Sequence, residues 1–245
     1  MSGLPTMTTP ETMRAGAAPS MRRAWLLLWA TMPLAALSQT APGASEVAAY
    51  RGLHAAAQRG DLAALRQALA AAGDINALDG HGRTAVHVAT FARQREAIRV
   101  LAAAGADLDR LESDRYDAVT IASVADDEES LRLLLALGAS AKLVTSRYDG
   151  TALIAAAHLG HDGVVRQLIS AGAPLDHVNN LHWTAAIEAV VLGDGGPRHQ
   201  STLRALVDAK ANLQLTDRSG RTPLVLARER GYAAMVRILE SAPAR

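Results

Sequence analysis

Residues 151–156 read Thr-Ala-Leu-Ile-Ala-Ala, and hexads of the same kind occur at five other places along the chain. These other hexads begin at Arg51, Thr84, Asp117, Thr184 and Thr222. The first residues of successive hexads lie 33, 33, 34, 33 and 38 residues apart. A period of this length predicts a stack of repeated supersecondary units, each the size of a helical hairpin.

A second set of apolar residues keeps the same period. After each hexad comes an apolar stripe with the three-residue spacing of one helix face. In several copies the stripe stops at a glycine, such as Gly105, Gly138 or Gly172, and glycine commonly ends a helix. We therefore predict six copies of helix, turn, helix and loop. The stripe residues are Leu65 and Ala68, Ile98 and Leu101, Leu131 and Leu134, Val165 and Leu168, Leu203 and Leu206, and Val236 and Leu239.

The composition agrees with a helical core and excludes several kinds of chemistry. Of the 245 residues, 49% are hydrophobic, with few aromatic side chains, which favours close-packed helices rich in Ala and Leu. The chain has no cysteine, so disulfides, thiol catalysis and cysteine-based zinc sites are excluded. The formal net charge is +1, which lacks the electrostatic footprint of a protein that binds nucleic acid.

These motifs resemble those of the ankyrin-repeat family, whose repeats contain Thr-Pro-Leu-His at a 33-residue period. The residues that carry the resemblance are Thr222-Pro223-Leu224, Leu53-His54-Ala55-Ala56 and Gly160-His161-Asp162-Gly163-Val164-Val165. The resemblance runs from Tyr50 to about Ala242. It implies an all-α solenoid of about six helix-turn-helix repeats with short β-hairpin-like finger loops. The third copy departs most, with Asp117 in place of Thr, and the fifth has extra residues and Lys210 in place of Gly.

In this family the fingers and the first helices line a concave groove, so the resemblance implies where a partner would bind. Aromatic and arginine side chains dominate binding hot spots when they gather at one place. The alternative is that the finger aromatics brace the loops against each other, and both interpretations stay open. The candidate partner-binding residues are Tyr116, Arg147, Tyr148, Asp149, His158, Asn180, His182, Trp183 and Glu188.

Glu188 is unusual because the equivalent residue of every other copy is apolar. A carboxylate in such a column needs a hydrogen-bond donor or open solvent. Asn180, His182 or His158 could supply that donor in a structural network. Contact with a ligand is the alternative.

The chain offers no convincing metal or catalytic site. Five histidines fall in the fourth and fifth copies, but they occupy different surfaces, and His54, His87 and His161 match structural positions of the family. We find no phosphate-binding glycine loop, nucleophile elbow or paired carboxylates, so we expect neither an enzyme nor a cofactor. The insertion 193–200 in the fifth copy is interpreted as either a tolerated surface loop or a second contact point.

The N-terminal region is typical of an export signal. Met21-Arg22-Arg23 precedes an apolar run from Ala24 to Leu37, and small residues follow. This pattern predicts cleavage before Gln39. A membrane anchor that is never cut is the alternative, but the run has only 14 residues, and a membrane span needs about 20. Whether Met21 is the true start, and whether export follows the general or the twin-arginine route, stays open.

We therefore divide the chain into an extension and signal peptide over 1–38, disordered or removed, a linker over 39–49 and an ankyrin-repeat domain over 50–245. Residues 176–180 and 193–199 are similar to those of exported bacterial (periplasmic) ankyrin proteins. We expect a periplasmic or secreted monomer without stable membrane insertion after cleavage, acting as a protein-protein interaction scaffold. The alternative is a small-ligand or peptide binder that uses the groove of copies 3–5.

Overall fold

The computed structural model describes residues 39–71 and 73–243. The predicted signal peptide and extension over 1–38 lie outside the described residues. Thirteen helices form in the described part, and no strand does. The helices are α2 (Ala44–Ala49), α3 (Gly52–Arg59), α4 (Leu62–Ala70), α5 (Ala85–Phe91), α6 (Arg95–Ala103), α7 (Ala118–Val124), α8 (Glu128–Ala136), α9 (Ala152–Leu159), α10 (Asp162–Ser170), α11 (Ala185–Val191), α12 (Pro197–Asp208), α13 (Pro223–Glu229) and α14 (Ala233–Glu240).

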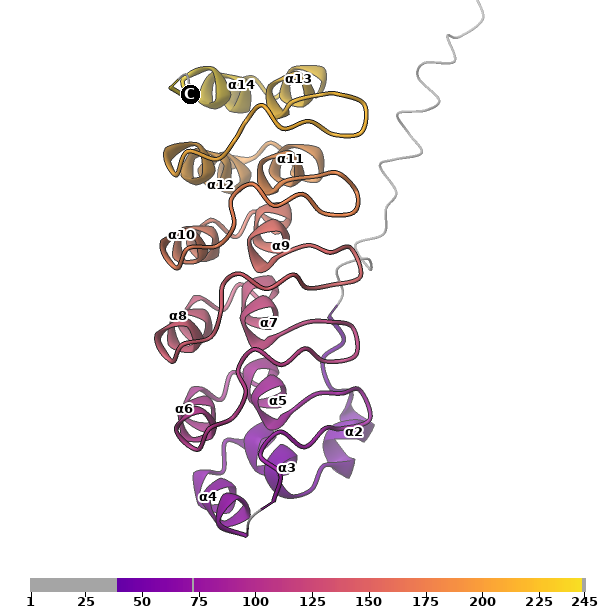
Figure 1. Cartoon of the computed structure of the whole chain (residues 1–245), viewed down its shortest axis with the longest axis vertical. Helices are drawn as coiled ribbons and strands as arrows, with labels where there is room; N and C mark the ends of the chain where they lie inside the picture. The colour runs from indigo at the N-terminus through magenta and orange to yellow at the C-terminus, as the bar shows by residue number, and fades with distance from the viewer. Residues whose placement is uncertain (1–38, 72, 244–245) are drawn as a thin grey trace, which may run out of the picture. The chain divides into compact units, whose positions relative to one another are not determined.

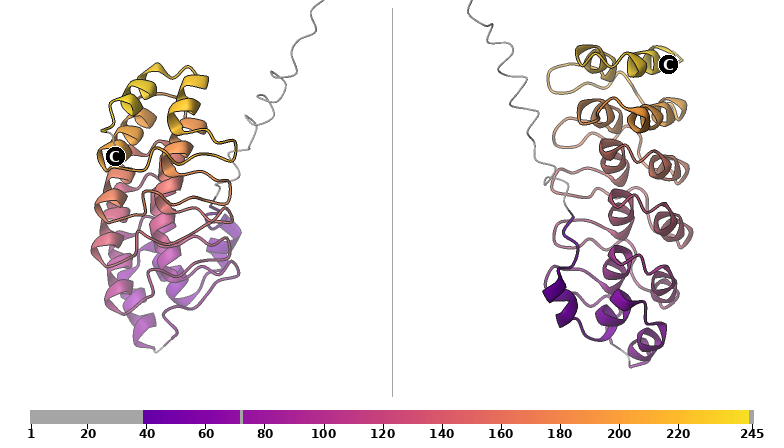
Figure 2. Two further views of the ribbon diagram at one scale, coloured as in Figure 1. Left: turned by 45° about the horizontal axis from the view of Figure 1, so that its top comes forward. Right: turned by 180° about the vertical axis from the view of Figure 1, so that it is seen from behind.

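Residues 39–243 form a stack of six helical hairpins, which confirms the predicted ankyrin-repeat solenoid (Figure 1). The first helices of the hairpins pack on one another in an inner column, from α3 to α13, and the second helices form an outer column, from α4 to α14. The loops that lead into α5, α7, α9, α11 and α13 project beyond the inner column, and all lie on one side (Figures 1 and 2). We call these loops the fingers, and we count each finger with the hairpin that follows it, as repeats 2 to 6.

Four of the six hexads begin an inner helix with a residue whose side chain caps it. The side chains of Asp117, Thr151, Thr184 and Thr222 each accept a hydrogen bond from the backbone N–H three residues later, at 2.9 to 3.4 Å. An Asp caps a helix as well as a Thr does. The departure at Asp117 therefore keeps the local structure of the family.

The apolar stripe of each outer helix forms the core, as predicted. Leu65, Ile98, Leu131 and Leu203 are fully buried between neighbouring repeats. The stripe residue Val236 is only partly buried because repeat 6 is the last repeat of the described residues and none of them covers its outer side. Each interior stripe thus depends on the next repeat for its burial.

The predicted fingers form without strands in the described residues. Repeat 4 has one isolated antiparallel bridge, between Thr145 and Gly150, and the other fingers are turns. The fingers are therefore hairpin-like in path and hold their shape by other hydrogen bonds, described below.

Residues 39–49, which we expected to be a linker, contain helix α2 and lie against the finger of repeat 2. Arg83, at the base of that finger, is only 1% exposed. Its guanidinium pairs with Asp79 at 2.7 Å and with Glu46 of α2, and it donates to the carbonyl oxygen of Thr40 at 3.1 Å. Tyr50 donates to the other side of this cluster, at 2.8 Å from Asp79. The segment is ordered because it pairs and covers a buried charge, which the local sequence does not reveal.

The finger at the other end of the stack also has an arginine that pairs with two carboxylates, but this arginine is not covered. Arg221 occupies the equivalent position in the finger of repeat 6 and pairs with Asp217 at 2.7 Å and Glu229 at 3.1 Å. Its side chain is 38% exposed, because no segment of the described chain covers it. Each terminal arginine thus has two carboxylates, but only Arg83 is desolvated.

This difference predicts unequal effects of one substitution. Arg83→Met leaves Asp79 without its main partner and is expected to lower the free energy of unfolding by about 3 kcal/mol. It should also expose the backbone amides of α2 to hydrogen exchange. The matched variant Arg221→Met is expected to cost clearly less, because the Arg221 guanidinium is not desolvated and water can reach the contacts that it leaves. Urea unfolding and hydrogen exchange measure both effects, and equal costs would contradict this account of α2.

Burial shifts the pKa values of two groups in the interior of the stack in opposite directions. Burial lowers the pKa of His87 to about 4, against the opposing effect of hydrogen bonds to the carbonyl oxygens of Arg110 and Tyr116. Burial raises the pKa of Asp117 to about 6, against the opposing effect of hydrogen bonds from Thr120. As pH falls from the ordinary histidine pKa of 6.5, the unfolded chain binds the His87 proton first, and stability is lost. The folded chain binds the Asp117 proton first, so stability is gained between pH 6 and 3.8.

The two contributions are separable by substitution. His87→Gln should remove the loss, so that the free energy of unfolding decreases less between pH 7 and 4.5, by a difference on the order of 2 kcal/mol from the wild type. Asp117→Asn, which keeps the helix cap, should instead make the decrease larger. Urea unfolding of the three proteins at the two pH values measures these differences. A His87→Gln protein with the wild-type pH dependence would contradict the prediction.

Candidate binding surface

Each finger contains a tight turn, and the side chain of the residue that begins this turn, here called the first finger residue, fixes its shape. In repeat 5, Asn179 Oδ1 accepts hydrogen bonds from the backbone N–H groups of Leu181 and Trp183, at 3.0 and 2.9 Å. Asp79, Glu112 and Asp217 make the same pair of contacts in their own fingers, and Ser146 makes one. These local bonds fix the turn before any contact with a neighbour.

Neighbouring fingers are also joined to one another. A backbone N–H of one finger donates to a carbonyl of the previous finger, as from Ser146 to Arg115 at 2.9 Å and from Asn180 to Tyr148 at 3.0 Å. Two reciprocal ion pairs join the fingers of repeats 3 and 4, with Arg115 at 2.9 Å from Asp149 and Arg147 at 3.4 Å from Asp114. The fingers therefore form a connected row instead of independent loops.

The predicted finger aromatics divide into two kinds. Tyr116 and Trp183 are 5% and 7% exposed, because they stand at the base of their fingers, directly before the helix cap. This is the position that Arg83 holds in repeat 2. Their burial favours the bracing interpretation for both residues. Tyr148 lies further out on its finger and is partly exposed, so its ring remains available to a partner.

The polar candidates on the fingers form an exposed rim. The side chains of Arg147 and Asp149 are 70% and 50% exposed, and Asn180 and His182 are also exposed. Asn180 is fixed in this rim because its side-chain amide donates to the carbonyl oxygen of Arg147 at 3.0 Å. The structure thus brings together five of the nine predicted residues on the adjoining fingers of repeats 4 and 5. This rim consists of Arg147, Tyr148, Asp149, Asn180 and His182.

Glu188 and His158, the two candidates on inner helices, lie together. Glu188 lies in the first turn of α11 and is 4% exposed. Its Oε2 lies 3.2 Å from Nδ1 of His158 on α9. Oε1 accepts a hydrogen bond from the side-chain amide of Asn179 at 3.0 Å. Of the three donors proposed from sequence, only His158 lies near Glu188. Asn180 donates instead to the carbonyl oxygen of Arg147, and within the described residues His182 makes no contact with Glu188. Asn179 was missed, although it is the one amide in its column of finger residues.

The histidines mostly join one repeat to the next. His54, His87 and His161 lie 2.9 Å from the carbonyl oxygens of Arg83, Arg110 and Ser123, which confirms their structural role. His177 and His199 make the same kind of contact with Asp149 and His158. Imidazoles used in this way are not free to gather around an ion. Within residues 39–71 and 73–243, no three His, Asp or Glu side chains could hold one together.

The insertion of repeat 5 lengthens α12 and joins three other repeats. Arg198 reaches back to Asp126 of repeat 3 at 2.7 Å, and His199 lies 2.9 Å from the carbonyl oxygen of His158 in repeat 4. The His199 ring also packs so close to Gly160, which has φ of +68°, that a Cβ there would clash. In the other direction, Tyr232 of repeat 6 donates to the carbonyl oxygen of Gly193 at 3.1 Å. The insertion therefore has a bracing role in the stack.

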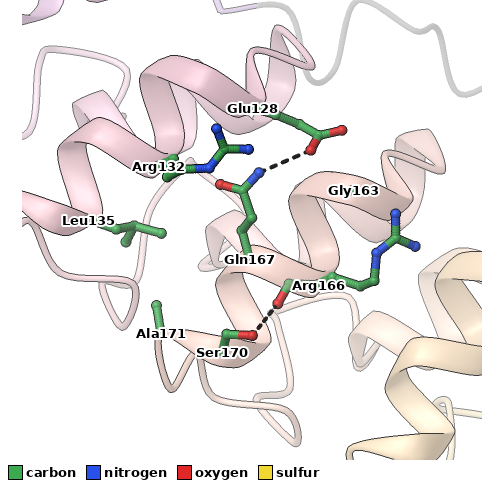
Figure 3. Close-up of a pocket in the computed structure, with 8 residues that line it drawn as sticks. All are labelled: Glu128, Arg132, Leu135, Gly163, Arg166, Gln167, Ser170 and Ala171. Atoms are coloured by element: carbon green, nitrogen blue, oxygen red, sulfur yellow. Dashed lines mark hydrogen bonds between the residues drawn. The ribbon is translucent and has the colours of Figure 1, made fainter.

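Two shallow hollows lie on the outer helices, away from the fingers. Figure 3 shows the first, about 470 Å³ in volume, between α8 and α10. Glu128 and Gln167 meet across it at 3.0 Å, and Arg132 and Arg166 also line it (Figure 3). The second, of about 440 Å³, lies between α10, α12 and α14. Neither hollow includes any of the nine candidate partner-binding residues, although Pro197 and Gln200 of the insertion line the second.

Comparison with known proteins agrees with this architecture. The family profile described as ankyrin repeats (3 copies) matches residues 53–145, 119–217 and 153–243. The ankyrin repeat protein YahD of Escherichia coli (strain K12) is 35% identical over 190 residues, which cover 77% of this chain and 94% of that protein. The chain belongs to the ankyrin-repeat family.

Solved structures of ankyrin repeats are similar in the same region. An ankyrin repeat domain from Acinetobacter baumannii AYE is 41% identical, with a TM-score of 0.74, and the match covers 79% of this chain and 98% of that one. The ankyrin repeat protein EF0377 is 29% identical, with a TM-score of 0.73, over 79% of this chain and all of that one. Proteins of this family generally mediate protein–protein interactions and are generally not enzymes. In the part of the chain that the structure describes, no helix has the length and apolar character of a membrane span.

Proposed function

We propose that this protein is an interaction scaffold of the bacterial envelope that binds another protein on its fingers and inner helices. The observation that carries the proposal is the rim of repeats 4 and 5, where five exposed or partly exposed candidates stand on fingers held by their neighbours. Side chains fixed before binding lose little entropy when a partner arrives. A ring, two charges, an amide and an imidazole also suit a protein surface of mixed polarity.

The alternative, a small-ligand or peptide binder in the groove of repeats 3–5, has less support. Tyr116 and Trp183, which would line such a groove, are buried at the bases of their fingers. The two hollows described above lie on the outer helices. A small molecule retained by the purified protein and released on denaturation would favour this alternative.

Site-specific cross-linking tests the binding surface. A photoreactive phenylalanine in place of Tyr148 is expected to cross-link one discrete partner protein in living cells, because this ring is the accessible aromatic of the rim. The same residue in place of Arg132, exposed on outer helix α8, is the matched control and should give no such product. Mass spectrometry of the products identifies the partner. Cross-linking of a discrete partner from Arg132 but not from Tyr148 would mean that the outer helices bind the partner, and it would contradict the proposal.

The envelope location rests on the apolar run after Met21-Arg22-Arg23. We expect residues 1–45 to export a fused alkaline phosphatase, which is active only outside the cytoplasm, and the mature protein to begin near Gln39. Leu27→Arg places a charge in the apolar run and should abolish phosphatase activity. Phosphatase activity and N-terminal sequencing are the measurements. An inactive wild-type fusion, or a mature protein that keeps the run, would refute export with cleavage.

A further inference from the structure

We propose that the Glu188–His158 pair is a binding site for one cationic side chain of the protein partner, an arginine or a lysine. In this site the guanidinium or ammonium group of the partner replaces the imidazole of His158 at the carboxylate of Glu188. The inference rests on the proposed function and names the chemistry by which the partner is recognised. Four observations lead to it.

The first observation is that the buried carboxylate has unused hydrogen-bonding capacity. Two carboxylate oxygens offer about four acceptor positions. Glu188 Oε1 uses one of these for Asn179, whereas Oε2 accepts no hydrogen bond, although His158 Nδ1 lies 3.2 Å away. Proximity without hydrogen-bond alignment leaves the imidazole a poor donor. A buried charge with so few donors is costly, so a better donor would bind to it favourably.

The second observation is that a charge at this position is not needed for the fold. The equivalent residue of the other inner helices is Ala, Val, Ile or Leu, and those helices pack in the same column. An aliphatic residue would fill the same place in α11 without any desolvated charge. The residues are Ala55, Val88, Ile121, Ala155 and Leu226.

The third observation is a matching change in the finger of repeat 5. The first finger residue is an acid in repeats 2, 3 and 6, namely Asp79, Glu112 and Asp217. An acid at the same place in repeat 5 would repel Glu188. Asn179 shapes its finger as an acid does and in addition donates to Glu188. The two positions together keep a negative charge in the inner column of this repeat.

The fourth observation is that the side chain of His158, which covers Glu188, has few polar contacts to hold it in place. The side chain of His158 is 20% exposed. Within the described residues, Glu188 is the one polar group in contact with its imidazole. The hydrogen bond from His199 goes to the backbone of His158 and leaves the ring free to turn. Rotation of this one side chain into solvent therefore uncovers the carboxylate.

A cation with several N–H donors satisfies what the site lacks. A guanidinium can give two parallel hydrogen bonds to a carboxylate, and an ammonium can give one with full charge. Either group supplies the positive charge and the aligned donor that the imidazole does not. A neutral donor of the same shape supplies only the hydrogen bonds and should bind weakly.

The test uses N-acetyl-arginine amide as the probe and the full-length protein labelled with nitrogen-15. The side-chain amide signals of Asn179 report on Glu188, because this amide donates to it. We expect the probe to shift these signals in a saturable way, whereas the uncharged N-acetyl-citrulline amide should shift them little. Glu188→Gln keeps an acceptor for Asn179 and is expected to weaken binding of the arginine probe by about tenfold or more. Glu96→Gln, which makes the same change at an exposed carboxylate of outer helix α6, is the matched control and should leave the affinity unchanged.

A second variant separates a covering role of His158 from a purely structural role. His158→Ala removes the group that competes for Glu188, so the arginine probe should bind more tightly than to the wild type. Weaker binding to His158→Ala, equal shifts with arginine and citrulline, or an unchanged affinity in Glu188→Gln would each overturn the proposal. If cross-linking from Tyr148 captures a partner while the arginine probe gives no response, the scaffold function stands and this inference alone fails.

Discussion

The structure depends on the burial of apolar side chains between repeats. A hairpin of two short helices cannot cover its own apolar face, and Leu131 or Leu203 reaches complete burial only because another hairpin lies on each side. At roughly 1.5 to 3 kcal/mol for each such side chain, two or three per interface offset the ordering of a repeat only when many interfaces are added together. The ends of the stack are therefore the places where additional devices are needed. The pairing of Arg83 with α2 and of Arg221 with Glu229 are two such devices.

The same stacking makes the fingers suitable for recognition. An isolated loop would be mobile by itself, but each finger here has one side chain that fixes its turn, and backbone bonds join the fingers of repeats 2 to 5 to one another. The helices supply only the spacing. The scaffold can therefore vary its exposed finger residues with little effect on the core, and in the proposed function such residues, Arg147 and Tyr148 among them, give the specificity.

Much of the fold could be predicted from sequence because its signal is periodic. The hexads mark the caps, and Asp117 fits the pattern because a carboxylate caps a helix as a hydroxyl does. Contacts between positions that share no pattern could not be predicted. Helix α2 is ordered by Arg83, and Tyr116 is buried by its place at a finger base, not by its residue type. At Glu188 the three donors considered were Asn180, His182 and His158, whereas the actual donor is Asn179, because neighbouring residues of a turn point in different directions.

The ion pair between Arg198 and Asp126 joins repeats 5 and 3, which are not neighbours in the stack. In a linear array each unit ordinarily communicates only with the units beside it, so the ends can fray while the middle persists. A bond that skips one unit couples the opening of repeat 4 to that of both flanking repeats. Because an exposed ion pair is weak, the coupling is small, but it makes the middle of the stack somewhat stiffer under tension than either end.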